Sequence, residues 1–294
     1  MVCFYRATVF WYQSKINNLR ETRIEINVLQ VLNLSHLLVG YSSALAFVKL
    51  VDRFSLTLVA GSRHGNLGYV DGIGESARFS NISGIGRQRD GFVVADLGNS
   101  CLRRVDKASF NTTTYAGLCQ VSGTNDGQLR FARFTSPRCI VMVGRFVNSF
   151  YLVDLNVVRK VAGGIVTTLT QLTLDGDSYL SITFSENGRF FATTEGGKIV
   201  KHRNDKPLKV VAGTNCSRCS FPDLNLTKPS DLLFVNKHVL LVADTVASGI
   251  WVINLDLETV DFRMSAQPKS LAIDEQHIFV GGTNEITRHP YLCK

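Results

Sequence analysis

An internal repeat constrains the fold of this chain more than any other feature of its sequence. The segment from Leu58 to Asp106 holds two short β-type runs and a fixed order of turn residues, and this order returns from Tyr115 onward. The period is about 55 residues, and five features shared in order over such a period are far more specific than a single glycine-rich match. The matched positions include Gly61 with Gly117, Asp71-Gly72 with Asp126-Gly127, and Ala77-Arg78-Phe79 with Ala132-Arg133-Phe134.

The first copy ends in a second signature, Val94-Ala95-Asp96 followed by Asn99, Leu102 and Arg103. Together the two signatures resemble NHL repeats, and this resemblance implies blades of a β-propeller. The resemblance is strong over residues 58–145 and weaker as a motif beyond them, where Asp154 and Asp244 keep the aspartate of the signature. As architecture it covers most of the chain.

Short β-type runs at regular spacing, with turn signals between them, predict six units of four antiparallel strands. We therefore expect an all-β fold, a six-bladed β-propeller over residues 24–294, preceded by an N-terminal segment of residues 1–23. A composition with 45% hydrophobic and 19% charged residues is typical of a folded globular protein. The repeats are expected near residues 24–60, 81–116, 138–171, 178–212, 229–263 and 268–290.

The sixth unit supplies only three strands before Lys294. An empty outer position would expose an unpaired strand edge, so another segment should fill it. Residues 4–12 are rich in aromatic and β-branched residues, and we expect them to close the last blade by pairing antiparallel with residues 284–290. This pairing would place Cys3 beside Cys293 as a candidate disulfide; the alternative is a frayed N-terminus with two unpaired thiols.

The repeated polar residues are expected to build turns. Asp and Asn side chains close tight turns by bonding to the backbone two residues on, and Asp-Gly pairs supply a glycine with positive φ. Phe79 and Phe134 are expected to fill the gaps between neighbouring blades. The expected structural turn residues are Asp71, Gly72, Asp96, Asn99, Asp126 and Gly127.

The three longest loops, residues 61–80, 117–136 and 213–228, should all lie on one face, because last-to-first strand connections project from the same side of a propeller. Long loops on a rigid scaffold are common recognition sites. The sequence therefore predicts that a binding site, if present, lies on this face. Its candidate residues are Arg63, His64, Tyr69, Arg78, Arg130, Arg133 and Arg218.

Histidine and cysteine patterns do not indicate a metal site, and no cofactor is expected. His36, His238 and His277 each precede the second strand of a unit, but equivalent turns of adjacent blades lie on the order of 10 Å apart, too far for one zinc ion. We expect them to be exposed turn residues. Cys216 and Cys219 lack a second ligand pair at matching spacing. The sequence contains no G-x-S-x-G, H-E-x-x-H or P-loop motif, which favours a non-catalytic protein.

Seven cysteines and five N-x-S/T sequons favour an oxidising, secretory compartment. Cys119 and Cys139 bracket one long loop, so a disulfide between them is the simplest pairing to expect. Arg6 interrupts the N-terminal apolar run, which is therefore not typical of a signal peptide, and no apolar run approaches the roughly 20 residues of a membrane span. The sequon asparagines are Asn33, Asn81, Asn111, Asn215 and Asn225.

The leading interpretation is an extracellular, non-catalytic module that binds a protein or glycan partner through the long-loop face. The net charge of +8 permits RNA as a partner, so the alternative is an intracellular adaptor or RNA-binding propeller, as the NHL domains joined to RING and B-box regions resemble. A lesser alternative is a metal-dependent lyase or lactonase, because some propellers of similar class are such enzymes.

Overall fold

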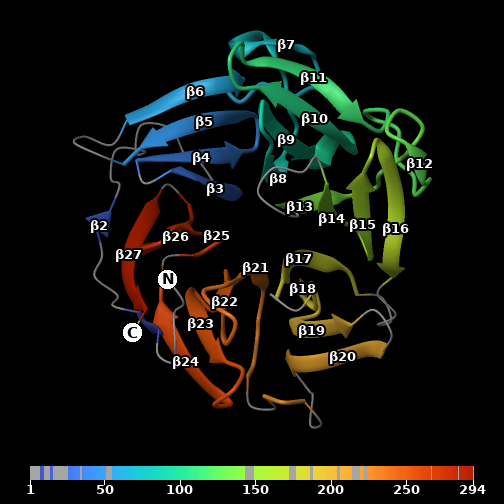
Figure 1. Ribbon diagram of the computed structural model, residues 1–294. Coiled ribbons are helices and arrows are strands. Elements are labelled where there is room, and N and C mark those ends of the chain that lie inside the picture. Colours follow the sequence, from blue (N-terminus) through green and yellow to red (C-terminus); the bar gives the residue numbers. More distant parts are fainter. Residues whose placement is uncertain are drawn as a thin grey trace. The chain divides into compact units, whose positions relative to one another are not determined.

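Six antiparallel β-sheets make up this chain, which folds as the all-β six-bladed β-propeller that its sequence predicts (Figure 1). The protein divides into two units, Asn27–Gln171 and Met1–Ile26 with Leu172–Lys294, and each unit holds three blades. The structure, a computed structural model, describes residues 7–9, 14–15, 26–33, 35–50, 55–142, 149–171, 177–185, 188–203, 206–213, 219–221, 224–265, 267–283 and 285–293.

The unit of residues 27–171 contains blades 1 to 3. Blade 1 consists of β3 (Val28–Asn33), β4 (His36–Tyr41), β5 (Ala44–Lys49) and β6 (Ser55–Gly61). Blade 2 consists of β7 (Gly72–Ile73), β8 (Ile82–Arg87), β9 (Gly91–Asp96), β10 (Cys101–Asp106) and β11 (Asn111–Ala116). Blade 3 consists of β12 (Gly127–Gln128), β13 (Pro137–Met142), β14 (Phe150–Asp154), β15 (Val157–Ala162) and β16 (Ile165–Gln171).

The other unit contains blades 4 to 6. Blade 4 consists of β17 (Tyr179–Phe184), β18 (Phe190–Thr194), β19 (Lys198–Arg203) and β20 (Lys206–Gly213). Blade 5 consists of β21 (Pro229–Phe234), β22 (Val239–Asp244), β23 (Gly249–Asn254) and β24 (Thr259–Met264). Blade 6 consists of β25 (Ser270–Ile273), β26 (His277–Gly281), β27 (Ile286–Cys293), β1 (Ala7–Val9) and β2 (Ser14–Lys15).

The N-terminal segment closes the last blade, as predicted, but in a different register. Residues 7–9 pair with residues 291–293 and residues 14–15 with residues 287–288, where the sequence predicts residues 4–12 opposite residues 284–290. β1 and β2 both pair antiparallel with β27, so this strand of blade 6 has neighbours on both sides. Ala7 is the backbone partner of Cys293 in this register, at the position where the sequence predicts Cys3. Cys3 and the side chain of Cys293 lie outside the described residues, and their disulfide stays a prediction.

The second strand of a blade is its most buried element. Every residue of β9 and of β22 is buried, because both faces of an interior blade strand pack against other parts of the propeller. Phe79 is fully buried in a cluster with Leu38 of blade 1 and Val94 of blade 2. Phe134 is buried likewise with Leu102 of blade 2 and Phe150 of blade 3. The prediction that these two aromatic rings fill the gaps between blades is confirmed.

Blades 2 and 3 each have five strands, as blade 6 does, where the sequence predicts four. The Asp-Gly segments of the long loops form the short strands β7 and β12, which pair with the outer strands β11 and β16 (Figure 1). The loops 61–80 and 117–136 therefore do not stay on one face, because their middle parts run along the outer edges of blades 2 and 3. No described helix is long and apolar enough to cross a membrane.

Candidate interaction surface

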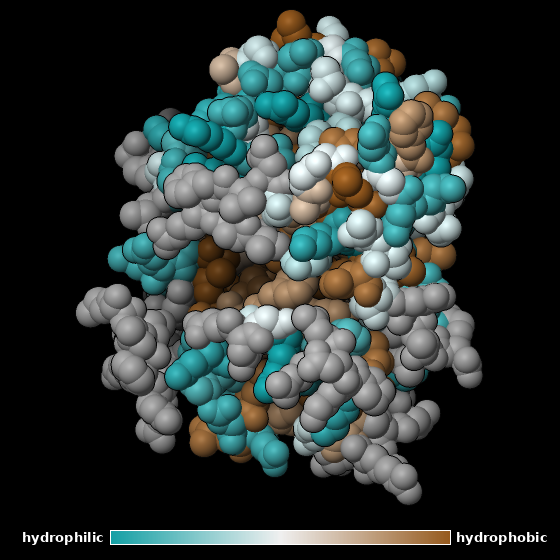
Figure 2. Space-filling view, turned by 45° about the vertical axis from the view of Figure 1, so that its right-hand side comes forward, coloured by the Kyte–Doolittle hydropathy of each residue, from teal (hydrophilic) through white to brown (hydrophobic). Residues whose placement is uncertain are grey.

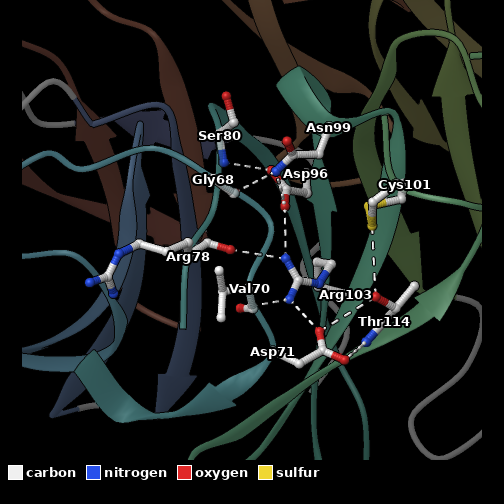
Figure 3. Close-up of a disulfide and its surroundings, with 11 residues drawn as sticks. Gly68, Val70, Asp71, Arg78, Ser80, Asp96, Asn99, Cys101, Arg103 and Thr114 are labelled. Atoms are coloured by element: carbon white, nitrogen blue, oxygen red, sulfur yellow. Dashed lines mark hydrogen bonds and ion pairs between the residues drawn. A yellow bond between two sulfur atoms is a disulfide. The ribbon is translucent and has the colours of Figure 1, made fainter. Parts of the chain in front are cut away.

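A fully buried arginine anchors the first long loop to blade 2 (Figure 3). Nη1 of Arg103 donates to Oδ2 of Asp96 at 3.2 Å and to the backbone oxygen of Arg78 at 2.9 Å. Nη2 donates to Oδ1 of Asp71 at 2.6 Å and to the backbone oxygen of Val70 at 3.1 Å. The planar guanidinium thus joins its own blade to two points of the loop.

Blade 3 repeats this arrangement at equivalent positions. Nη1 of Arg159 donates to Oδ2 of Asp154 and to the backbone oxygen of Arg133, each at 3.1 Å. Nη2 donates to Oδ1 of Asp126 at 2.8 Å and to the backbone oxygen of Asn125 at 2.9 Å. The same ion-pair geometry in two blades shows that the buried arginine is part of the repeat.

Each buried arginine also lies over the phenylalanine of its Ala-Arg-Phe segment. The guanidinium carbon is 5.4 Å from the ring centre of Phe79 in blade 2 and 5.3 Å from that of Phe134 in blade 3, within cation–π range. The Asp-Gly aspartates are therefore more than turn residues, because each one pairs with a buried arginine. A sequence signal for this pairing exists: aspartate and arginine are 32 residues apart in one repeat and 33 in the other.

The carboxylates at the centre of these clusters are buried as well. Burial raises the pKa of Asp96, while hydrogen bonds from Asn99 and the Ser80 backbone and the charge of the buried arginine oppose this rise. Burial raises the pKa of Asp154 in the same way. Opposing contributions of this kind are expected where a buried acid is compensated by hydrogen bonds and an ion pair.

Asn99 joins the two long loops of this unit. Its Nδ2 donates to the backbone oxygen of Gly68 at 2.7 Å and to Oδ2 of Asp96 at 2.8 Å. Its backbone oxygen accepts from the N–H of Gln120 at 2.7 Å. Asn99 is buried and ends the short 3-10 turn Leu97–Asn99 between β9 and β10. One residue of blade 2 thus holds the first loop at Gly68 and the second loop at Gln120.

A disulfide between Cys101 and Cys119 fixes the start of the second loop, with the Cα atoms 5.0 Å apart. The predicted pairing of Cys119 with Cys139 is therefore wrong. Leu102 pairs with Ala116 across β10 and β11, so the chain that leaves β11 passes beside Cys101, whereas Cys139 lies in β13 of the next blade. Cys219 is also disulfide-bonded.

Four apolar side chains next to these anchor points are exposed. We define the loop surface as these four residues. Leu67 and Tyr69 lie beside Gly68 in the first loop, and Leu118 and Val121 lie beside Gln120 in the second. Apolar side chains reach the exterior between hydrophilic ones in the space-filling view (Figure 2). The exposed fractions are 59% for Leu67, 47% for Tyr69, 49% for Leu118 and 43% for Val121.

A pocket of about 470 Å³ lies beyond the loop surface, toward the outer edge of blade 3. Its lining includes Tyr115, Leu129, Arg130 and Ile165. The guanidinium of Arg130 lies 4.6 Å from the ring centre of Phe131, which is itself 56% exposed. This edge therefore presents a cation and an apolar ring next to a hollow.

The predicted binding residues divide into exposed ones and ones that hold their own loop. Arg63, His64, Tyr69 and Arg130 are exposed, and Arg63 forms an ion pair with Glu75 at 3.0 Å. Arg78 and Arg133 are half-buried and donate to backbone oxygens of their own loops, with equivalent bonds to Ala77 and Ala132 at 2.7 Å each. Arg218 lies outside the described residues.

The described residues contain no group of histidine, cysteine, aspartate and glutamate side chains that could hold a metal ion. The three turn histidines are half-buried, although the sequence predicts exposed ones. His238 contacts the carboxylate of Asp256, and Nδ1 of His277 lies 3.4 Å from Oδ1 of Asp274. Nδ1 of His36 lies 2.8 Å from the hydroxyl of Ser35, so each of the three rings has a polar neighbour.

Asp231 is a site that sequence reasoning missed. It lies on β21 and accepts hydrogen bonds from Oγ of Ser181 at 2.6 Å, from the N–H of Leu271 at 2.8 Å and from the N–H of Leu232 at 2.9 Å. Burial raises its pKa to about 6. Because Ser181 belongs to blade 4 and Leu271 to blade 6, one carboxylate connects the first strands of three consecutive blades.

Comparisons with known proteins agree with this fold. No model of a protein family matches the chain, and no curated protein matches it. Solved propeller structures do match. A catalytically inactive virginiamycin B lyase from Staphylococcus aureus with quinupristin is 11% identical, with a TM-score of 0.65 over 98% of this chain and 100% of that chain.

Two other solved structures are similar. A gluconolactonase from Xanthomonas campestris is 10% identical, with a TM-score of 0.69 over 97% of this chain and 91% of that chain. A chain of a nidogen/laminin complex is 14% identical, with a TM-score of 0.55 over 84% of this chain and 85% of that chain. Identities this low show a shared fold and leave function to the residues of the site.

Proposed function

We propose that this chain is an NHL-type propeller that acts as a non-catalytic interaction module and binds a protein partner through its loop surface. The carrying observation is the exposure of four large apolar side chains on two loops that Asn99 joins. Contiguous apolar patches at the exterior mark protein interaction sites, and the two bonds of Asn99 hold the loop backbones beside these side chains together. Loops that are already ordered lose less conformational entropy on binding.

The charge around the loop surface favours a partner with both apolar and acidic groups. Arg63 and Arg130 are exposed on the two loops, and arginine and aromatic residues are enriched in protein interfaces. Acidic residues on the partner would complement these cations and speed association. The Cys101–Cys119 disulfide supports an extracellular location, because disulfides persist mainly in oxidising compartments.

The NHL assignment is supported by the way the repeat residues work together. In blades 2 and 3 the arginine of the second signature meets the aspartate of the Asp-Gly pair. In blade 5, Asp244 keeps hydrogen bonds to the N–H groups of Thr227 and Lys228, while Trp251 stands where the arginine would be. Blade 5 thus keeps the aspartate of the motif but not the arginine with which that aspartate would pair.

The RNA-binding alternative receives less support from the arginines. Arg103 and Arg159 are buried, and Arg78 and Arg133 donate to their own loops, so fewer cations face outward than the net charge of +8 suggests. RNA binding remains an outcome of the test below.

The test compares the wild-type chain with a loop variant carrying Leu67→Ser, Tyr69→Ser and Val121→Ser. A matched control carries Val246→Ser, Leu257→Ser and Met264→Ser, which change exposed apolar residues of blade 5. The proteins are crosslinked in material from the native source, and a recovered partner is then titrated in purified form. Binding that the control retains and the loop variant loses by tenfold or more supports the proposal. Equal binding by all three proteins overturns it.

A parallel titration with an RNA pool addresses the alternative. Affinity that falls steeply with salt and is lost in Arg63→Glu with Arg130→Glu would favour an RNA-binding propeller instead.

A further inference from the structure

The described sequon asparagines share an exposed position that most other described asparagines lack. All four that the structure describes, Asn33, Asn81, Asn111 and Asn225, are exposed. The remaining described asparagines are buried or half-buried except for two. The buried or half-buried ones are Asn27, Asn99, Asn156, Asn236 and Asn254, and the exposed ones are Asn66 and Asn125.

The side-chain nitrogen of each sequon asparagine is also available. Oδ1 of Asn33 accepts from the N–H and the hydroxyl of Ser35, the third residue of its own sequon, at 2.9 and 2.8 Å. Oδ1 of Asn81 accepts from Nδ2 of Asn27 at 3.1 Å. Within the described part of the chain, Nδ2 of the four sequon asparagines donates no hydrogen bond, whereas Asn27 and Asn99 use Nδ2 as a donor. Nδ2 is the atom to which an N-linked sugar is joined.

Asn111 has an additional feature. It begins β11 and lines a surface pocket of about 330 Å³ together with Arg104, Asp106, Ser109 and Thr113. These side chains supply both donors and acceptors of hydrogen bonds, which suits the hydroxyl groups of a sugar. A sugar attached to Asn111 would therefore have polar partners within reach.

We propose that Asn33, Asn81, Asn111 and Asn225 carry N-linked glycans, and that the first sugar on Asn111 contacts the pocket beside it. The reaction joins Nδ2 to the anomeric carbon of a diphosphate-activated oligosaccharide, breaks the bond from that carbon to the diphosphate, and releases one amide proton. The inference rests on the extracellular location in the proposed function, since this transfer takes place in the secretory compartment. None of the four asparagines belongs to the loop surface, so their glycans are compatible with partner binding there.

The test uses the chain purified from its native source. Peptide N-glycosidase in heavy-oxygen water converts each glycosylated asparagine into labelled aspartate, which mass spectrometry locates. We expect label at the four sequon asparagines and none at Asn66 and Asn125, which are exposed but lie outside sequons. A sequon asparagine that stays unlabelled is removed from the proposal, and four unlabelled ones overturn it.

A non-reducing digest of the same sample separates this inference from the location on which it rests. A bridged Cys101–Cys119 with bare sequons overturns glycosylation and leaves the extracellular location standing. Free thiols together with bare sequons overturn both.

In recombinant secreted protein, Thr113→Ala should abolish label at Asn111 and leave the other three sites unchanged. Label that survives at Asn111 in this variant would contradict sequon-directed transfer. For the pocket, we expect the Asn111 glycan to be trimmed faster by glycosidase in Arg104→Ala, and an unchanged rate would refute the contact.

Discussion

Arg103 lies 3.2 Å from the carboxylate of Asp96, and both side chains are fully buried. The pair of Arg159 and Asp154 in the next blade lies at 3.1 Å with the same burial. Replacing both members of such a pair by apolar residues of the same size is often neutral or stabilising, but a buried charge left without its partner is strongly unfavourable. Its second role is positional, because the same guanidinium binds Asp71 in the long loop.

Arg103→Leu should lower the free energy of unfolding by about 3 to 5 kcal/mol, because Asp96 is left buried without its counter-charge. Urea unfolding followed by fluorescence measures the change. Arg104→Leu, at the exposed neighbouring position, should stay within about 0.5 kcal/mol of the wild type. If Arg103→Leu does not fold, Asp71→Asn supplies a milder test, with an expected loss of about 1 kcal/mol since Asp71 is half exposed. Equal stability of the Arg103 and Arg104 variants would show that the pair does not support the blade.

Removal of the disulfide should destabilise the chain and loosen the second loop. The bridge spans 18 residues, and Cys101→Ala with Cys119→Ala should lower the free energy of unfolding by about 2 to 4 kcal/mol. Thermal unfolding with and without reductant measures this change, and the double variant should no longer respond to the reductant at this site. Cys139→Ala should leave the Cys101–Cys119 peptide in a non-reducing map unchanged. A peptide linking Cys119 to Cys139 would contradict the structure.

Asn99→Ala should release the two long loops from each other. The variant loses the side-chain hydrogen bonds to Gly68 and Asp96, while Oδ2 of Asp96 keeps its bond from Nη1 of Arg103, so we expect a loss of about 1 to 2 kcal/mol. Limited proteolysis should then cut within residues 62–80 faster than in the wild type, while residues 117–136 keep the bond from Gln120 to the backbone oxygen of residue 99. Asn66→Ala changes an exposed asparagine of the same loop and serves as the control. Unchanged cleavage rates would mean that other contacts order these loops.

The sequence predicts the blades well because their determinants are local and repeated. Phe79 and Phe134 end equivalent segments of the repeat, and each segment comes directly before the first strand of a blade. The repeat therefore shows where each of these blades begins and that its aromatic ring is buried beside it. The closure of blade 6 by the N-terminal segment follows from the need to cover an open strand edge. Both expectations depend on the repeat period and on the need to pair an open strand edge, and both can be seen in the sequence alone.

The contacts of the site depend on residues far apart in the chain, and these were predicted less well. The pairing of Cys101 with Cys119 can be predicted from the sequence, because the register of the hairpin from Cys101 to Ala116 brings the two cysteines together. The short strands β7 and β12 cannot be predicted in this way, because two residues such as Gly72 and Ile73 are too few to show a strand pattern. Asp231 gives no local signal either, since its partners Ser181 and Leu271 are 50 and 40 residues away.

Asp231 should make stability depend on pH in a defined window. Its folded-state pKa of about 6 lies above the ordinary value near 4 of an aspartate in the unfolded chain, so between these values the folded state holds a proton that the unfolded state has lost. This contribution to stability is fully present below about pH 4 and is lost as the pH rises through about 6.

Asp231→Asn keeps the shape of the neutral side chain but cannot ionise. From pH 4 to pH 7 the wild type should therefore lose about 2 to 3 kcal/mol of unfolding free energy relative to this variant. Urea midpoints for both proteins across this range measure the difference. Ser181→Ala removes a hydrogen bond that favours the ionised carboxylate and should move the loss to higher pH. Parallel curves for wild type and Asp231→Asn would show that the pKa of Asp231 is the same in the folded and the unfolded chain, which would contradict the raised value.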